Sequence, residues 1–167
     1  MDNISDKGTP VMNDQGASGK GLDSRIFMQP VKDLKFSLPV VLDIEESVQD
    51  AIMFMQVKQF GCLLVTEKHE LVGILTERDI ISKAIGEEKG FHDLKVKDIM
   101  TPNPETFRED DTIGFAMKAM TAGGYRHVPI VDNENIPVGI VSVRDIVSFI
   151  VDHFAAEVLN LPPRPRR

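Results

Sequence analysis

The sequence predicts an α+β protein built from two structural repeats that pack into one module. The segment Gly-Ile-Leu-Thr-Glu-Arg-Asp-Ile at 73–80 recurs as Gly-Ile-Val-Ser-Val-Arg-Asp-Ile at 139–146, which is 66 residues later. Val-Lys-Asp-Leu at 31–34 recurs as Val-Lys-Asp-Ile at 96–99, and the apolar positions 48, 51, 52 and 55 recur at 113, 116, 117 and 120. Recurrence in one order at nearly one offset is typical of structural repeats.

Each repeat is expected to contain a helix, two strands and a final helix. Positions 48, 51, 52 and 55 follow the spacing of one helix face, and Ser47 with Asp50 three residues later is an N-capping signature. The matching helix begins at 111–112. The apolar runs 62–65 and 128–131 predict buried strands, and 71–75 and 137–141 complete two hairpins. The final helices start at Thr76 and Ser142, and the one extra residue of the second repeat is placed in the loop after its first helix.

Composition excludes several functional classes. The chain has 167 residues, of which 42% are hydrophobic, and its 26 acidic and 19 basic residues give a net charge of −7. This charge argues against nucleic acid and anionic membranes as general partners, because both select positive surfaces. A single cysteine, Cys62, forms neither an internal disulfide nor a cysteine-cluster zinc site, and burial in a strand predicts an inert thiol. No apolar run is long enough to span a membrane, so a cytoplasmic location is expected.

The chain ends differ from the repeats in composition. Residues 1–25 are rich in Gly, Asp, Asn and Ser, which predicts disorder. Gly-Lys-Gly at 19–21 is not a phosphate loop, since the first glycine and the final hydroxyl of that motif are absent. The repeats are assigned to 26–88 and 89–153, and 154–167 forms a tail rich in Pro and Arg.

Two hydroxyl-x-x-carboxylate motifs begin the final helices, Thr76 to Asp79 and Ser142 to Asp145. One interpretation is a capping box, in which each hydroxyl and carboxylate bond to the helix backbone. The other is a nucleotide site, in which the carboxylate accepts ribose hydroxyls and the helix start attracts an anion. The neighbouring guanidinium groups of Arg78 and Arg144 are candidates for phosphate contacts.

A second candidate cluster occurs only in the second repeat. Gly123 and Gly124 permit close backbone approach, and Arg126 and His127 offer hydrogen-bond donors to phosphate. An ordinary loop with a solvated arginine is the alternative. The first repeat has Gln-Phe-Gly-Cys at 59–62 in this place and no basic group.

Together these segments resemble the CBS domain, which is named after cystathionine β-synthase, as a tandem pair or Bateman module. The resemblance covers about residues 30–152 and rests on Asp-Ile-Met-Thr-Pro at 98–102, Tyr-Arg-His-Val-Pro-Ile-Val at 125–131 and the repeated Gly-to-Asp segments. It implies two βαββα units packed through their sheets with pseudo-two-fold symmetry. It also implies adenosine ligands between the units: AMP, ADP or ATP, with S-adenosylmethionine as a further possibility and Mg²⁺ only if ATP carries it.

The resemblance also implies roles for single residues. Asp79 and Asp145 would hold ribose, with Thr76 and Ser142 nearby, and Thr101 would lie by the base or sugar. The remaining nucleotide-binding candidates, the phosphate-binding ones first, are Arg126, His127, Arg144, Arg78, Tyr125 and Pro129. Phe36 is aligned with Thr101, and the first repeat lacks an Arg-His pair, so a phosphate-bearing ligand is supported less well there.

Two functions remain open at this level. The first is a regulatory module that binds an adenine nucleotide and acts in trans on a target protein that the sequence does not identify. The second is a ligand-free dimerisation or docking module that uses Met-rich helix faces. Both are compatible with a homodimer of CBS pairs, and no feature of the sequence supports an enzyme.

Overall fold

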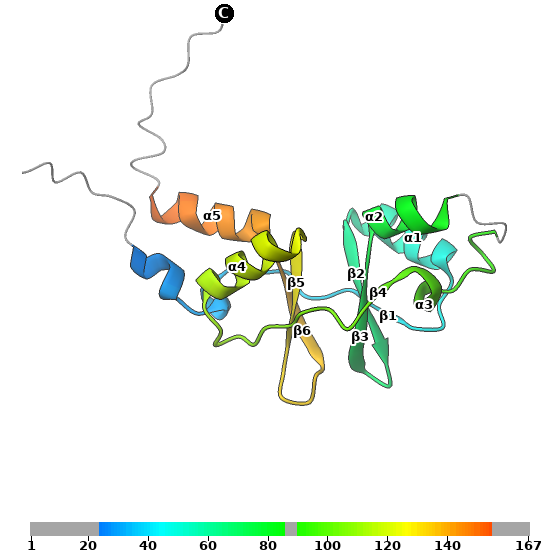
Figure 1. Cartoon of the computed structure of the whole chain (residues 1–167), viewed down its shortest axis with the longest axis horizontal. Helices are drawn as coiled ribbons and strands as arrows, with labels where there is room; N and C mark the ends of the chain where they lie inside the picture. The colour runs from blue at the N-terminus through cyan, green and yellow to red at the C-terminus, as the bar shows by residue number, and fades with distance from the viewer. Residues whose placement is uncertain (1–23, 86–89, 155–167) are drawn as a thin grey trace, which may run out of the picture.

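The computed structural model describes residues 24–85 and 90–154, which form two α+β halves lying side by side (Figure 1). The expectations for 1–23, for 86–89 and for the tail 155–167 fall outside these residues. The 3₁₀ helix η1 (Ser24–Met28) starts inside the segment expected to lack structure. Its Ile26 side chain is buried, and η1 packs against α4 (Ile113–Gly123). Burial of this apolar side chain explains why order begins here.

The first half contains a four-stranded sheet in the order β1-β2-β3-β4. Strands β1 (Val41–Asp43) and β2 (Cys62–Glu67) are parallel, whereas β2 pairs antiparallel with β3 (Glu70–Thr76), and β3 with β4 (Thr101–Pro102). The helices are α1 (Val48–Lys58), α2 (Glu77–Asp79), the π-helix η3 (Ile80–Ala84) and α3 (Val96–Ile99).

The second half repeats this arrangement. Helix α4 precedes the antiparallel pair β5 (His127–Val131) and β6 (Pro137–Ser142), and α5 (Val143–His153) follows. Isolated bridges take the place of the outer strands: Phe107 lies parallel to β5, and Ser37 lies antiparallel to β6. Strand β4 of the second repeat thus pairs with β3 of the first, and Ser37 of the first repeat pairs with β6 of the second, which links the two halves.

The expected helices, hairpins and caps are confirmed. Ser47 is the N-cap of α1, where its Oγ accepts a hydrogen bond of 3.1 Å from the Asp50 N–H, and Thr112 caps α4 in the same way. Positions 48, 51 and 55 of α1 and 113, 116 and 120 of α4 are buried. Short helices also form at both copies of the Val-Lys-Asp motif, where η2 (Val31–Asp33) matches α3.

The register of the strand comparison was wrong by one residue. Cys62 lies opposite Thr76, and His127 lies opposite Ser142, so Cys62 is the counterpart of His127. The extra residue of the second repeat accordingly lies in its hairpin turn and not after its first helix. The runs 62–65 and 128–131 that were compared are apolar throughout, so their composition does not distinguish one register from the next.

The alignment of Phe36 with Thr101 was also wrong. Thr101 pairs with Ile74 in the first sheet, and Ser37 bridges to Ile140, which is the counterpart of Ile74. Ser37 therefore matches Thr101, and both sites retain a hydroxyl. Phe36 instead covers Gly139, much as Met100 covers Gly73 in the other half. Short extended segments carry no periodicity that fixes such a register.

The sheets pack on each other through a shared apolar cluster. Each half has its own core between sheet and helices. A third cluster joins the halves and consists of Cys62, Leu64, Leu71, Ile74 and Val131, with Ile140 packed against it. This confirms the packing through the sheets that the resemblance implied. No helix within the described ranges is long and apolar enough to cross a bilayer.

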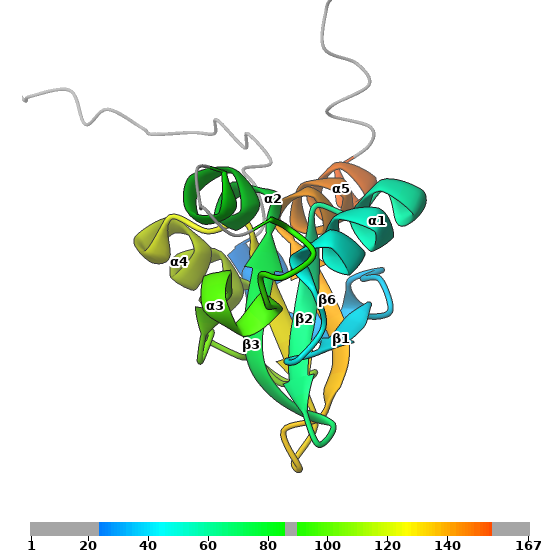
Figure 2. The same ribbon diagram turned by 90° about the vertical axis from the view of Figure 1, so that its right-hand side faces the viewer.

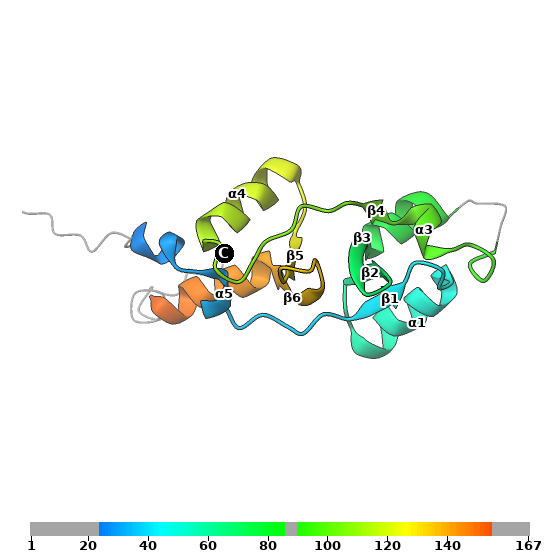
Figure 3. The ribbon, with the colours of Figure 1, turned by 90° about the horizontal axis from the view of Figure 1, so that it is seen from below.

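The helices α1, α2, α4 and α5 lie on one side of the molecule, and the hairpin turns lie on the opposite side (Figures 1 and 2). Seen from below, the segment before β1 and the segment after β4 run between the two halves on opposite sides of the molecule (Figure 3). Each of these segments thus borders the space where the two sheets meet.

Replacing Gly139 by alanine should destabilise the protein. A Cβ atom at this position would lie 2.3 Å from a ring carbon of Phe36, so the ring has to move out of its place on β6. We expect the free energy of unfolding to fall by about 1–3 kcal/mol, measured by denaturant titration. Gly90→Ala is the control, because a Cβ there meets nothing within 4 Å. Equal stability of the two variants would contradict close packing over Gly139.

Candidate functional site

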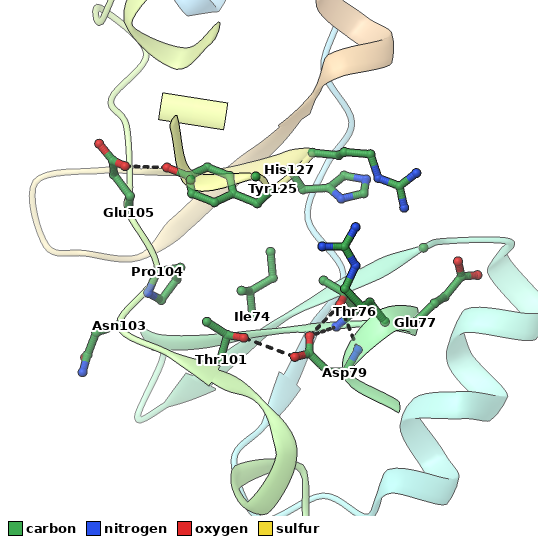
Figure 4. Close-up of a pocket in the computed structure, with 15 residues that line it drawn as sticks. Ile74, Thr76, Glu77, Asp79, Thr101, Asn103, Pro104, Glu105, Tyr125 and His127 are labelled. Atoms are coloured by element: carbon green, nitrogen blue, oxygen red, sulfur yellow. Dashed lines mark hydrogen bonds between the residues drawn. The ribbon is translucent and has the colours of Figure 1, made fainter. Parts of the chain in front are cut away.

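Two cavities lie between the halves, each with the aspartate of one repeat at its wall. The Asp79 cavity has a volume of about 380 Å³ and is bordered by the start of α2, by Thr101 on β4 and by residues 123–127 (Figure 4). The Asp145 cavity has a volume of about 440 Å³ and is bordered by the start of α5, by Ser37 and by residues 59–62. The cavities are thus related by the pseudo-symmetry of the fold.

Asp79 is held by a complete capping box. Its Oδ2 accepts hydrogen bonds from the Thr76 N–H at 3.0 Å and the Thr76 hydroxyl at 2.5 Å, while its own N–H donates to that hydroxyl at 3.2 Å. Its Oδ1 accepts from Lys83 Nζ at 2.7 Å and from Thr101 Oγ1 at 3.2 Å. Burial alone would raise the pKa of Asp79, but the bonds from Lys83 and Thr76 outweigh it and lower the pKa.

Asp145 forms the same capping box in the other half. Its Oδ2 accepts from the Ser142 N–H and the Ser142 hydroxyl, both at 2.7 Å. Within residues 24–85 and 90–154, no hydrogen bond reaches its Oδ1. The capping interpretation of both motifs is therefore correct as a description of the fold. It leaves the ligand interpretation open at Asp145, since capping uses only one of the two oxygens.

The wall opposite each aspartate belongs to the other repeat. Opposite Asp79 stand Tyr125 and His127, and the Tyr125 hydroxyl donates a hydrogen bond to Glu105 (Figure 4). Burial and that hydrogen bond raise the pKa of Tyr125 to about 12. The Asp145 cavity has Phe60 and Cys62 at the matching positions. Burial raises the pKa of the Cys62 thiol to about 12, which agrees with the expected inert thiol.

Arg126 and His127 lie where the two cavities meet. Both residues border both cavities, together with Gly61 and Glu77. Burial, and next the charge of Arg126, lower the pKa of His127, so its imidazole is neutral near pH 7. The Arg126 side chain is exposed and carries the permanent positive charge of this shared wall.

The structure groups the predicted residues differently from the sequence. Thr101, Tyr125, Arg126 and His127 belong to the second repeat, but they face Asp79 of the first repeat together with Thr76 and Arg78. Ser142, Arg144 and Asp145 border the other cavity, where Arg126 and His127 lie beside them as the sequence predicted. Basic groups are therefore present at the first repeat's aspartate, contrary to the expectation. Pro129 is buried in β5 and borders neither of these cavities.

Sequence reasoning missed several residues of the Asp145 cavity. Its wall includes the apolar side chains of Leu38, Val40, Phe60, Leu64 and Ile140. Four of these, all except Ile140, lie in the first repeat, across the contact between the halves from Asp145. Lys83 was also missed. It lies four residues after Asp79, and the equivalent position after Asp145 is Phe149. A charged residue that replaces an apolar one at equivalent positions is a signal that the sequence comparison could have used.

No group of three or more His, Cys, Asp or Glu side chains that could hold a metal ion occurs in the described part of the chain. The groups that border the cavities can accept hydrogen bonds from hydroxyls through a carboxylate and attract anions through guanidinium groups.

Two α+β repeats, packed through their sheets with a carboxylate-bearing cavity on each side of the contact, define a tandem-repeat module. The chain belongs to the CBS-domain family, whose pattern matches residues 31–86 and 96–152.

The chain is similar to proteins that carry this repeat. It is 32% identical over 122 residues to the mitochondrial CBS domain-containing protein CBSX3 of Arabidopsis thaliana, covering 70% of this chain and 59% of that protein. Curated relatives from Methanopyrus kandleri and Arabidopsis are matched over 43% and 22% of their lengths. The chain thus spans only part of these relatives.

Solved structures share the fold. The CBS domain protein NE2398 has a TM-score of 0.68 at 34% identity, covering 72% of this chain and 97% of that one. The CBS domain pair of MJ0100, solved in complex with 5′-methylthioadenosine and S-adenosyl-L-methionine, has a TM-score of 0.65 at 30% identity, covering 72% and 98%.

The state of His127 can be measured by NMR titration of the ring signals. We expect a midpoint below 6.5, which rises in Arg126→Ala because one of the two causes of the shift is removed. A depressed pKa means that protonation favours the unfolded chain, so this contribution to stability is present above pH 6.5 and is lost below it. His127→Gln identifies the signal. A midpoint above 6.5 would contradict the burial of the ring.

Proposed function

We propose that the chain is a regulatory module that binds an adenine nucleotide or a related adenosine compound between its two repeats. One observation carries the proposal: each aspartate at a helix start shares a cavity with a hydroxyl of an outer segment, Thr101 for Asp79 and Ser37 for Asp145, and with the first hairpin strand of the opposite repeat. This arrangement supports the proposal because a carboxylate, which can accept hydrogen bonds from ribose hydroxyls, and a guanidinium, which can bind phosphate, border the same cavity. The ligands of the MJ0100 pair share the adenosine part of this proposal.

The assignments follow from the chemistry of the two walls. Asp79 and Asp145 accept ribose hydroxyls, because a carboxylate is an acceptor-only group. Arg126 and His127 contact the phosphate, joined by Arg78 in one cavity and Arg144 in the other. AMP, ADP and ATP all carry the required groups, and S-adenosylmethionine carries the sugar without the phosphate. Any Mg²⁺ would arrive with ATP.

The proposed action is regulation of another protein, in the cytoplasm and without catalysis by this chain. A ligand that contacts both repeats stabilises the arrangement of the two halves that it binds most tightly. The partner protein then binds this stabilised arrangement.

Arg126→Ala separates the roles of phosphate and sugar. The loss of a charge-assisted hydrogen bond should weaken AMP binding about 10-fold or more, measured by calorimetry at fixed salt, and leave adenosine within about twofold. Arg108→Ala is the matched control, since this exposed arginine borders neither cavity. An equal loss for AMP and adenosine would rule out a phosphate contact. Absence of binding by AMP, ADP, ATP and adenosine at millimolar concentration would reject the proposed function.

A second function, homodimer formation, is favoured by the exposed helix side. Large apolar side chains are exposed on α1, α4 and α5 and around η3, and all of these helices lie on one side of the molecule (Figure 2). They include Met53, Val57, Ile81, Phe115, Val147 and Val151. Large exposed apolar side chains gathered on one side of a protein are typical of an interface.

Val147→Asp tests this second function. Val147 is 52% exposed, and a charge there should lower the mass measured by light scattering from dimer to monomer. Ile136→Asp is the control, because Ile136 is exposed on the hairpin side. A monomeric wild-type chain would reject the homodimer.

A further inference from the structure

The two aspartates differ in their remaining capacity to accept hydrogen bonds. An ionised carboxylate offers about four lone-pair positions. In Asp79 all four are used, by the N–H and hydroxyl of Thr76, the ammonium of Lys83 and the hydroxyl of Thr101. In Asp145 the described contacts use two, both on Oδ2 and both from Ser142.

Lys83 is the origin of this difference. Its Nζ bonds to Asp79 Oδ1 at 2.7 Å and to the carbonyl oxygen of Ile99 at 3.0 Å, which joins η3 to the end of α3. Lys83 does not border the Asp79 cavity, so it reaches the carboxylate from outside the cavity. Four residues after Asp145, the other repeat has Phe149, an apolar side chain packed against the second core.

Thr101 uses the remaining hydrogen-bonding position of the Asp79 carboxylate, from the side of the cavity. It borders the cavity and donates to the same Oδ1 oxygen. Its counterpart Ser37 borders the Asp145 cavity and makes no hydrogen bond to Asp145 among the described residues. A ribose hydroxyl therefore reaches Asp145 directly, whereas at Asp79 it has to displace Thr101 or Lys83.

We propose that Lys83 occupies a hydrogen-bonding position of the Asp79 carboxylate that a ribose hydroxyl would otherwise use. An adenosine ligand therefore fills the Asp145 cavity first and the Asp79 cavity second. This inference rests on the proposed function and adds an order of filling to it. Lys83 acts here as a positioning residue, through Asp79, and makes no contact with the ligand.

The order can be measured by calorimetric titration of the full chain with adenosine, which carries the ribose hydroxyls without a phosphate. We expect two steps that differ at least 10-fold in affinity. Asp145→Asn should remove the tight step, and Asp79→Asn should remove the weak step. The asparagine variants retain an acceptor for the cap, and thermal unfolding confirms that each is folded. Two equal steps, or loss of the tight step in Asp79→Asn, would overturn the order.

Lys83→Met tests the cause of the order. The freed oxygen of Asp79 should tighten the weak step about 5-fold or more and leave the tight step unchanged. Lys83→Arg, which keeps a donor to the carboxylate, should keep the steps apart. A weaker second step in Lys83→Met would show that the ammonium assists the ligand and would overturn the proposal. Absence of adenosine binding to the wild-type chain would instead reject the proposed function, and the order with it.

Discussion

The apolar contact between the two sheets is the constraint on which both cavities depend. Leu64, Ile74, Val131 and Ile140 meet at this contact, and the strands that carry them continue into the ends that border the cavities. Since β3 and β6 end at the helix starts with the two aspartates, packing of the sheets also fixes where these carboxylates lie. Thr101 pairs with β3 and Ser37 pairs with β6, so each of these outer segments belongs to one repeat and pairs with the sheet of the other. Each segment adds one hydroxyl to a cavity.

The elements with strong periodicity could be predicted from the sequence. The faces of α1 and α4, the hairpins and the capping boxes each carry a local signal, either apolar spacing or a hydroxyl three residues before a carboxylate. The pairing of Ser37 with Ile140 carries no such signal, because a two- or three-residue extended segment has no period that sets its register. Most errors in the strand comparison arose in these apolar or extended segments.

The residues that border each cavity could not be predicted from the sequence, for a different reason. Sequence comparison groups residues by repeat, so it associated Arg126 and His127 with Asp145, whose cavity they do border, but not with Asp79 of the other repeat. Pseudo-two-fold packing places the start of each first hairpin strand across from the other repeat's aspartate. Arg126 and His127 consequently border the Asp79 cavity as well as the Asp145 cavity, whereas Cys62, the counterpart of His127, borders the Asp145 cavity and not the Asp79 cavity. One fold thus produces two cavities with the same carboxylate and different opposite walls.

Under the proposed function, the wall that the two cavities share provides a physical route for coupling the two ligand sites. Arg126 borders both cavities, and one guanidinium fork binds one phosphate group at a time in bidentate geometry. A phosphate-bearing ligand in one cavity therefore withdraws this donor from the other, and an uncharged adenosine compound does not. Under the proposed function, the state of the module then depends on the charge of its ligands as well as on their concentration. Coupling of this kind requires no movement of the halves, because the two cavities compete for one side chain.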